Sequence, residues 1–113
     1  MNKLKLILLL LVCNITLFAG GKVASFYHDK YHGRMTANGE IHNRDSLTCA
    51  HRTLPFGTKL LVTNVDNNKS IEVVVNDRGP FIKGREIDLS YAAADSLDFI
   101  EKGLQEVTIE IIK

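Results

Sequence analysis

Short segments rich in apolar and β-branched residues recur along the chain, several of them with the alternation of period two that predicts β-strands. They cover residues 22–27, 47–51, 58–65, 71–76, 86–89 and 105–112. The last segment shows the pattern most clearly, because Val107, Ile109 and Ile111 alternate with polar residues. The pattern indicates a mostly β protein.

One helix is predicted over residues 91–97. Ser90 can cap its N-terminus, and three consecutive alanines within it give a high helix propensity. Gly103 is expected to end a second turn before the last strand. Several short strands with so little helix favour a small β-barrel, although periodicity does not distinguish one barrel from another.

Two polar segments interrupt the strands. Residues 28–46 contain many Gly, Asn, Asp and His residues without a sustained period, which predicts a long surface loop. The second segment, "NDRGP", directly follows the apolar "IEVVV". Gly79 permits backbone angles that other residues avoid and Pro80 fixes the next one, so the turn should be stiff. It would hold Asp77 in place at the end of a buried strand.

The first twenty residues resemble a secretory signal more than part of a fold. Lys3 and Lys5 precede an apolar run, and Ala19 and Gly20 are small residues at its end. We therefore expect a signal peptide over residues 1–19 and a single domain over residues 20–113. A membrane anchor is the alternative, but the run is interrupted by Asn14 and is short for a span.

Cys13 leaves a second alternative, lipidation, since bacterial lipoproteins are cleaved just before a cysteine. Val12 is larger than the residue that usually precedes such a cysteine, and "ITLFA" is too apolar for a linker in water. The expected location is therefore the periplasm, where the protein could associate with the outer membrane, with a lipid anchor at Cys13 the less favoured case.

The net charge limits the possible binding partners, and the cysteine content limits the possible disulfides. The chain carries a formal net charge of +1, and loss of Lys3 and Lys5 with the signal would make the mature chain slightly negative. Nothing in the sequence resembles the basic stripe that nucleic-acid binding needs, so a neutral polymer is the better candidate partner. After cleavage Cys49 would be the remaining cysteine, so no internal disulfide is expected.

Three polar segments carry residues suited to catalysis: Glu40 in "TANGE", His51 in "AHRTLP" and Asp77 in "NDRGP". Glycosidic cleavage needs two carboxyl groups in different environments, because one donates a proton to the leaving oxygen while the other acts as a base or stabilises positive charge. Considered singly, an acid in a turn is more often solvated or part of a cap. Which of the two would be the acid is left open by the sequence.

Two other chemistries can be weighed against this interpretation. His28 and His32 are four residues apart, as on a metal-binding helix, but Gly33 and the loop-like composition argue against a helix, so no metal site is predicted. Cys49 and His51 fall on one face of a strand, like a thiol and its base. A small buried apolar role for Cys49 is the favoured interpretation.

Taken together, "GKVASFYHDKYHGRMTANGE", "LTCAHRTLPFGTKLLVTN" and "VVVNDRGPFIKGREIDLSYAAA" resemble the RlpA (rare lipoprotein A) family in order and spacing. The resemblance implies a six-stranded double-psi β-barrel with one or two short helices. It also implies an exported bacterial lytic transglycosylase that cleaves peptidoglycan glycan strands between N-acetylmuramic acid and N-acetylglucosamine, leaves 1,6-anhydro ends and prefers strands without stem peptides.

The family's functional residues fall on Asp77, Glu40 and His51, with His51 expected to orient one of the two carboxylates through a hydrogen bond. Residues expected to bind the glycan are Tyr27, Arg34, Thr36, Asn38 and Arg78. No cofactor or metal is expected, and the protein should be a monomer whose partner is peptidoglycan. The alternative is a non-catalytic, expansin-like module that binds the cell wall without cutting it.

Overall fold

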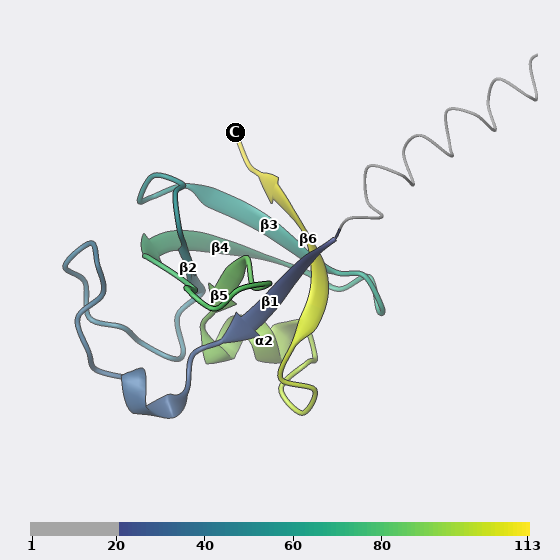
Figure 1. The fold of residues 1–113 in the computed structure, drawn as a ribbon, viewed down its shortest axis with the longest axis horizontal. Coiled ribbons are helices and arrows are strands. Elements are labelled where there is room, and N and C mark those ends of the chain that lie inside the picture. Colours follow the sequence, from purple (N-terminus) through teal and green to yellow (C-terminus); the bar gives the residue numbers. More distant parts are fainter. Residues whose placement is uncertain (1–20) are drawn as a thin grey trace, which may run out of the picture.

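The computed structural model describes residues 21–113, which form one small β-barrel (Figure 1). The predicted signal peptide and Cys13 lie outside the described residues. Six strands form the barrel: β1 (Lys22–Phe26), β2 (Thr48–His51), β3 (Lys59–Asn64), β4 (Ser70–Asp77), β5 (Ile87–Leu89) and β6 (Gln105–Ile111). The six strands predicted from the sequence are confirmed, with bounds that differ by at most one residue at each end.

The strands close in the order β1-β5-β2-β4-β3-β6. β1 pairs with β5 and β2 pairs with β4 in parallel, whereas the other neighbours are antiparallel. Parallel partners cannot be joined by a tight hairpin, so long connections must cross between them. The segment from β1 to β2 is also long, and it joins two strands that lie on either side of β5. Figure 1 shows it extending from the barrel on the side opposite β6.

Alternation along the strands builds the core. Leu60 and Val62 of β3 and Val73 and Val75 of β4 are fully buried, while the residues before and between them in the sequence are partly or wholly exposed. Because side chains in a strand point alternately to the two faces, this pattern fills the barrel from the inside. Phe99 adds the largest fully buried side chain.

The helix α2 (Tyr91–Ser96) packs against β1 and β4. Ser90 caps it as predicted, because its hydroxyl oxygen accepts a hydrogen bond from the Ala93 amide. The buried side chains of Ala93 and Ala94 bring the helix close to the barrel. The other short helix, η1 (Asp29–Tyr31), is a single 3-10 turn after β1. No helix among residues 21–113 has the length and apolar character that a membrane span requires.

Candidate active site

A groove of about 620 Å³ opens beside the end of β4. Its walls come from the end of β1, from the segment that follows it and from the turn after β4. Asp77 lies in this groove, so the structure places the predicted acid where a polymer could reach it. Other residues that line the groove and matter for its chemistry are Ser25, Tyr27, Arg34, Phe81, Arg85 and Asp88.

Asp77 is held by three hydrogen-bond donors. The Tyr27 hydroxyl donates to Oδ2, and the backbone amides of Ala37 and Arg78 donate to Oδ1 over 2.8 Å and 2.9 Å. A deprotonated carboxyl group only accepts hydrogen bonds, so this arrangement suits the carboxylate form. It also fixes the orientation of the side chain from three different parts of the chain.

Tyr27 contributes to the groove mainly through this hydroxyl group. Burial and the neighbouring Asp77 raise the pKa of Tyr27, so the phenol keeps its proton and donates a hydrogen bond to the carboxylate. Its ring packs edge-on against His42, with centroids 4.3 Å apart. Its hydroxyl group positions Asp77, and its contact with the glycan stays a prediction.

The long polar segment has a regular structure around residues 34–42. The amide of His42 donates to the Arg34 carbonyl over 2.7 Å, Met35 and Ile41 form an isolated β-bridge, and the Thr36 amide donates to the Glu40 carbonyl over 2.7 Å. These contacts make a small hairpin. We refer to residues 34–42 as the loop hairpin.

The tip of the loop hairpin docks on the end of β4. The Ala37 amide reaches Asp77, and the Asn38 amide donates to the Asn76 carbonyl over 3.2 Å. The Thr36 side chain is buried, and its hydroxyl lies 2.7 Å from Asn38 Oδ1 and 3.0 Å from the Glu40 carbonyl oxygen. Thr36 and Asn38 therefore shape the hairpin itself, in addition to the glycan contacts expected of them.

Glu40 lies on the same hairpin with an exposed side chain. The Asn38 side-chain amide donates to its Oε1. Glu40 is not among the residues that line the groove, unlike Asp77. The structure thus brings the two predicted carboxylates onto neighbouring segments without placing both in one cavity.

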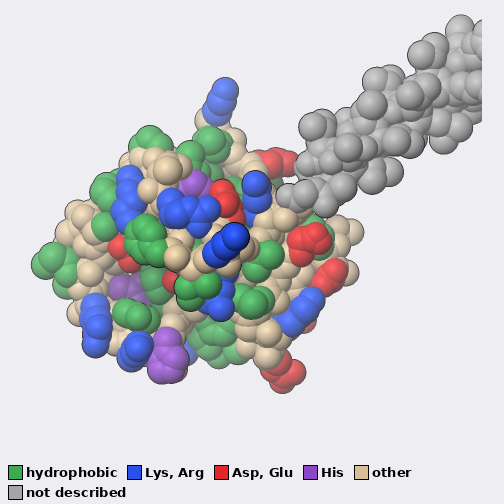
Figure 2. All heavy atoms as spheres, viewed as in Figure 1, with side chains coloured by type: hydrophobic (Ala, Val, Ile, Leu, Met, Phe, Trp, Pro, Cys, Tyr) green, Lys and Arg blue, Asp and Glu red, His purple; other side chains and the backbone are tan. Residues whose placement is uncertain are grey.

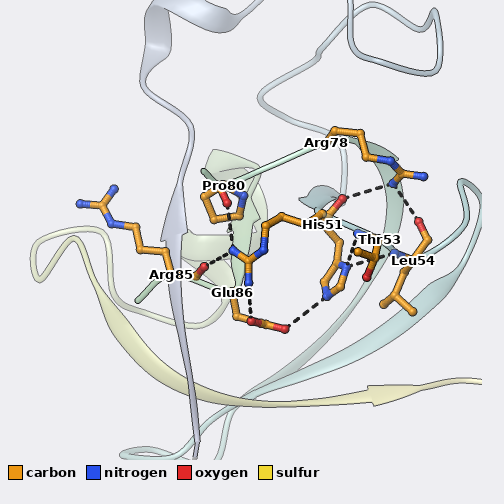
Figure 3. Close-up of polar contacts among 8 residues, drawn as sticks. His51, Thr53, Leu54, Arg78, Pro80, Arg85 and Glu86 are labelled. Atoms are coloured by element: carbon orange, nitrogen blue, oxygen red, sulfur yellow. Dashed lines mark hydrogen bonds and ion pairs between the residues drawn. The ribbon is translucent and has the colours of Figure 1, made fainter. Parts of the chain in front are cut away.

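His51 lies at the end of β2 and faces a different carboxylate from the one expected (Figure 3). Its Nε2 is 3.6 Å from Glu86 Oε1, and Glu86 Oε2 also pairs with Arg52 over 2.8 Å. The expectation that His51 orients Asp77 or Glu40 is therefore wrong. Sequence could not show this, because the pairing depends on β2 and β5 lying side by side.

The other nitrogen of His51 holds the turn that follows it. Nδ1 accepts hydrogen bonds from the Thr53 and Leu54 amides, both over 3.2 Å, so the proton of the neutral ring is on Nε2 (Figure 3). Burial, the largest contribution, lowers the pKa of His51 and favours this neutral form.

Arg78 connects this turn to Asp77. Its guanidinium donates to the carbonyls of His51 and Leu54 over 3.2 Å and 2.8 Å, and it stacks 4.0 Å from the centre of the Phe56 ring. The positive charge of Arg78 therefore lies at the turn after β2. Because Arg78 follows Asp77 directly, anchoring its side chain also fixes the backbone that carries the acid.

Cys49 is fully buried, as predicted. Burial raises the pKa of its thiol to about 12, so the thiolate that nucleophilic attack requires is not formed at neutral pH. The pairing of Cys49 with His51 as a catalytic couple therefore has no support in the structure.

Sequence reasoning missed Ser25 and Asp88, which line the groove, and His42, which packs against Tyr27. His42 is buried against Tyr27, and Ser25 donates a hydrogen bond to Asp88. The one available signal was Asp88 itself, an acid between the apolar residues Ile87 and Leu89 in a predicted strand. Because side chains alternate along a strand, Asp88 should point away from the core, to the opposite face of the sheet from Ile87 and Leu89.

Charges on the surface are mixed. On the face shown in Figure 2, basic and acidic side chains are interspersed with hydrophobic ones. Among residues 21–113, no group of three or more His, Cys, Asp or Glu side chains is placed to hold a metal ion.

The fold and the groove define a small double-psi β-barrel protein with a rigidly held carboxylate at its surface. A family described as "Lytic transglycolase" matches residues 19–109, and the chain belongs to this family. The resemblance to RlpA proteins is thereby confirmed, together with the predicted fold class.

Relatives with curated names agree with this assignment. The chain is 49% identical over 96 residues to "Endolytic peptidoglycan transglycosylase RlpA" of Pasteurella multocida, which covers 85% of this chain and 33% of the relative. It is 54% identical over 89 residues to the protein of the same name from Vibrio cholerae, covering 79% of this chain and 34% of the relative. The chain thus spans about a third of the length of these relatives.

Solved structures share the fold at lower identity. "Streptomyces papain inhibitor (SPI)" has a TM-score of 0.66 and 24% identity, with coverage of 82% of this chain and 93% of the other. An expansin from Clavibacter michiganensis has a TM-score of 0.64 and 19% identity, covering 81% of this chain and 49% of the other. These likenesses support the barrel architecture alone.

Proposed function

We propose that this protein is a lytic transglycosylase that cleaves peptidoglycan glycan strands between N-acetylmuramic acid and N-acetylglucosamine. The observation that carries the proposal is Asp77, a carboxylate fixed by three donors inside an open groove. Relatives about half identical to this chain are named endolytic peptidoglycan transglycosylases, which supports the same reaction here.

The reaction requires a proton donor and a group that accommodates positive charge. The donor protonates the oxygen between the two sugars, and the bond from that oxygen to the anomeric carbon of muramic acid breaks. The 6-hydroxyl of the same muramic acid then attacks the anomeric carbon and loses its proton to a base. No water is consumed, so the product carries a 1,6-anhydro end.

Asp77 is suited to stabilise the developing positive charge and to take the proton of the 6-hydroxyl, because its oxygens are held as hydrogen-bond acceptors. Glu40, which lies on the loop hairpin, is still predicted to assist the reaction as a base or by stabilising positive charge. His51 and Arg78 would serve by fixing the turn beside Asp77.

A preference for strands without stem peptides has a physical basis in the charge of the groove. Lys30, Arg34 and Arg85 line it. Removing a stem peptide from muramic acid leaves a free carboxylate on the lactyl group, whose negative charge is attracted to such cations. The groove would therefore bind a denuded strand better than one whose lactyl group is still amidated.

The test is digestion of purified peptidoglycan, with and without stem peptides, followed by mass spectrometry of the soluble products. We expect anhydro-ended fragments, released faster from the denuded substrate. Products heavier by one water would show a hydrolase. Retention of the protein on insoluble peptidoglycan with no released fragments would favour the non-catalytic, wall-binding alternative. Asp77→Asn serves as the inactive reference and Asp95→Asn, on the exposed face of α2, as the matched control.

A further inference from the structure

The groove contains a second acid, Asp88, in the same row of the barrel as Asp77. Ala50 of β2 is the register partner of Asp88 on β5 and of Asp77 on β4, where the register shifts by one residue between Cys49 and Ala50. Ser25 of β1 is the partner of Asp88 on its other side. The row Ser25, Asp88, Ala50, Asp77 thus crosses four neighbouring strands.

This register fixes how the two acids can meet a substrate. Directly opposed residues in neighbouring strands have their side chains on the same face of the sheet. Two strand spacings separate the acids, so their Cα atoms lie roughly 10 Å apart. The residue between them, Ala50, has a small side chain, and both acids line the groove. A bond held between them could be approached by one carboxyl group from each side.

The surroundings of Asp88 differ from those of Asp77. Its Oδ1 accepts one hydrogen bond, from the Ser25 hydroxyl over 3.2 Å. Burial raises the pKa of Asp88 to about 6 and the charge of Asp77 acts in the same direction, while Ser25 and Arg85 oppose the shift. The other titratable groups near it are the phenol of Tyr27 and the thiol of Cys49.

Glu40 is the other candidate for the general acid, and its surroundings differ from the partly buried groove position of Asp88. Its side chain is exposed on the loop hairpin and does not line the groove. A general acid has to reach the leaving oxygen and has to hold a proton near the working pH, which partial burial promotes.

We propose that Asp88 is the general acid of the reaction, acting across the groove from Asp77. This assignment rests on the proposed function. The Asp88 carboxyl group gives its proton to the glycosidic oxygen, which leaves as the 4-hydroxyl of N-acetylglucosamine as its bond to the anomeric carbon breaks. The 6-hydroxyl of muramic acid bonds to that carbon, and its proton passes to Asp77. Proton exchange with water then returns Asp77 and Asp88 to their starting states.

The first experiment compares wild type, Asp88→Asn and the control Asp95→Asn on denuded glycan. Because asparagine keeps the shape of the side chain and lacks the transferable proton, we expect Asp88→Asn to lose about 10²–10⁴ in cleavage rate. Sedimentation with insoluble denuded glycan should show binding within a factor of about three of wild type. Asp88→Asn cleaving at more than a tenth of the wild-type rate would overturn the assignment.

The second experiment is independent of activity. Carbon-13 NMR titration of the aspartate carboxyl groups should show Asp88 titrating at about pH 6 in the wild type. In Asp77→Asn its midpoint should fall, because the charge of Asp77 contributes to the upward shift. A midpoint near that of a free aspartate would overturn the assignment. Failure of the proposed function would show differently: the wild type itself would release no fragments, and the role of Asp88 as acid would fall with it.

Discussion

At the scale of single residues, Asp77 and Asp88 are similar side chains in different environments, and this difference supports the separate roles proposed for them. Asp77 receives a phenol and two backbone amides, whereas Asp88 is half-buried beside one serine hydroxyl. Donors favour a charged carboxylate and burial favours a neutral one. Enzymes that use two carboxyl groups rely on this difference to keep one as acid and the other as base.

Asp77→Asn should abolish cleavage with little loss of folding. The substitution is nearly isosteric, but an amide cannot take a proton from the 6-hydroxyl and carries no charge, so we expect a loss of about 10²–10⁴ in rate. Glycan release by chromatography measures the rate, and circular dichroism checks the fold. Retention of more than a tenth of the wild-type rate would exclude Asp77 from the mechanism.

Asp88 should make the protein less stable as pH rises from about 4 to about 6. Its pKa is raised by folding, so the folded state binds the proton more tightly than the unfolded state, and this contribution is lost as pH passes through the folded pKa. Urea unfolding at several pH values measures it. Relative to wild type, Asp88→Asn should gain on the order of 2–3 kcal/mol in unfolding free energy between pH 4 and pH 7. A difference independent of pH would contradict the expectation.

At the scale of elements, the segment between β1 and β2 matters most, because its loop hairpin supplies a donor to an acid on another strand. Its shape depends on Thr36, whose buried hydroxyl contacts Asn38 and the Glu40 carbonyl oxygen. The turn after β2 also helps to position Asp77. His51 accepts a hydrogen bond from this turn, and Arg78, the residue after Asp77, donates a hydrogen bond to it. Asp77 is therefore positioned by two irregular segments on a rigid barrel.

Thr36→Val should weaken catalysis more than stability. Valine keeps the volume and loses the hydroxyl, so Asn38 Oδ1 and the Glu40 carbonyl each lose a contact, at a cost of about 1–2 kcal/mol. The hairpin tip would then hold the Ala37 amide less firmly against Asp77. We expect a fall of about tenfold in cleavage rate, since a small misplacement of a positioned group is costly. Thr108→Val, on the partly exposed β6, is a matched control; equal rates for the two variants would argue against a role for the hairpin.

His51→Ala should loosen the turn after β2. The Thr53 and Leu54 amides would lose their acceptor, and the cost in unfolding free energy should be about 1–3 kcal/mol. Asparagine at this position can restore an acceptor near both amides, so His51→Asn should recover part of the stability and of the activity. Thermal unfolding and glycan release measured side by side would test this; a variant as stable as wild type yet inactive would instead indicate direct catalysis by His51.

At the scale of the whole molecule, six short strands close into a barrel whose core is made largely of aliphatic side chains. Closure leaves no open sheet edge, and the parallel pairs require long crossing segments. Those segments carry the groove. The architecture thus joins a packed interior to irregular segments that form the groove at its rim.

Location is a property of the whole chain, and we expect export with cleavage after Ala19 and no lipid. The mature protein would begin at Gly20. Intact-mass measurement after expression in a bacterial host distinguishes the cases, because an acylated Cys13 adds mass that peptide cleavage cannot mimic. Incorporation of a fatty-acid analogue that disappears in Cys13→Ser would show a lipid anchor and contradict the prediction.

The sequence by itself determined the elements of this protein. Alternation and runs of β-branched residues placed all six strands, Ser90 and the alanines placed α2, and the burial of Cys49 followed from its small apolar side chain in a strand. These features depend on neighbours within a few residues, so a local pattern contains them. It also identified Asp77, because a stiff glycine-proline turn after a buried strand is a local signal as well.

Only the tertiary structure decided which side chains meet. Tyr27 and Asp77 are fifty residues apart, and His51 and Glu86 come from strands that are not consecutive. Asp88 lies in the groove because β5 is between β1 and β2, and no local sequence pattern encodes this strand order. Contacts of this kind are set by how the barrel closes, since closure alone fixes the register of every strand against its two neighbours.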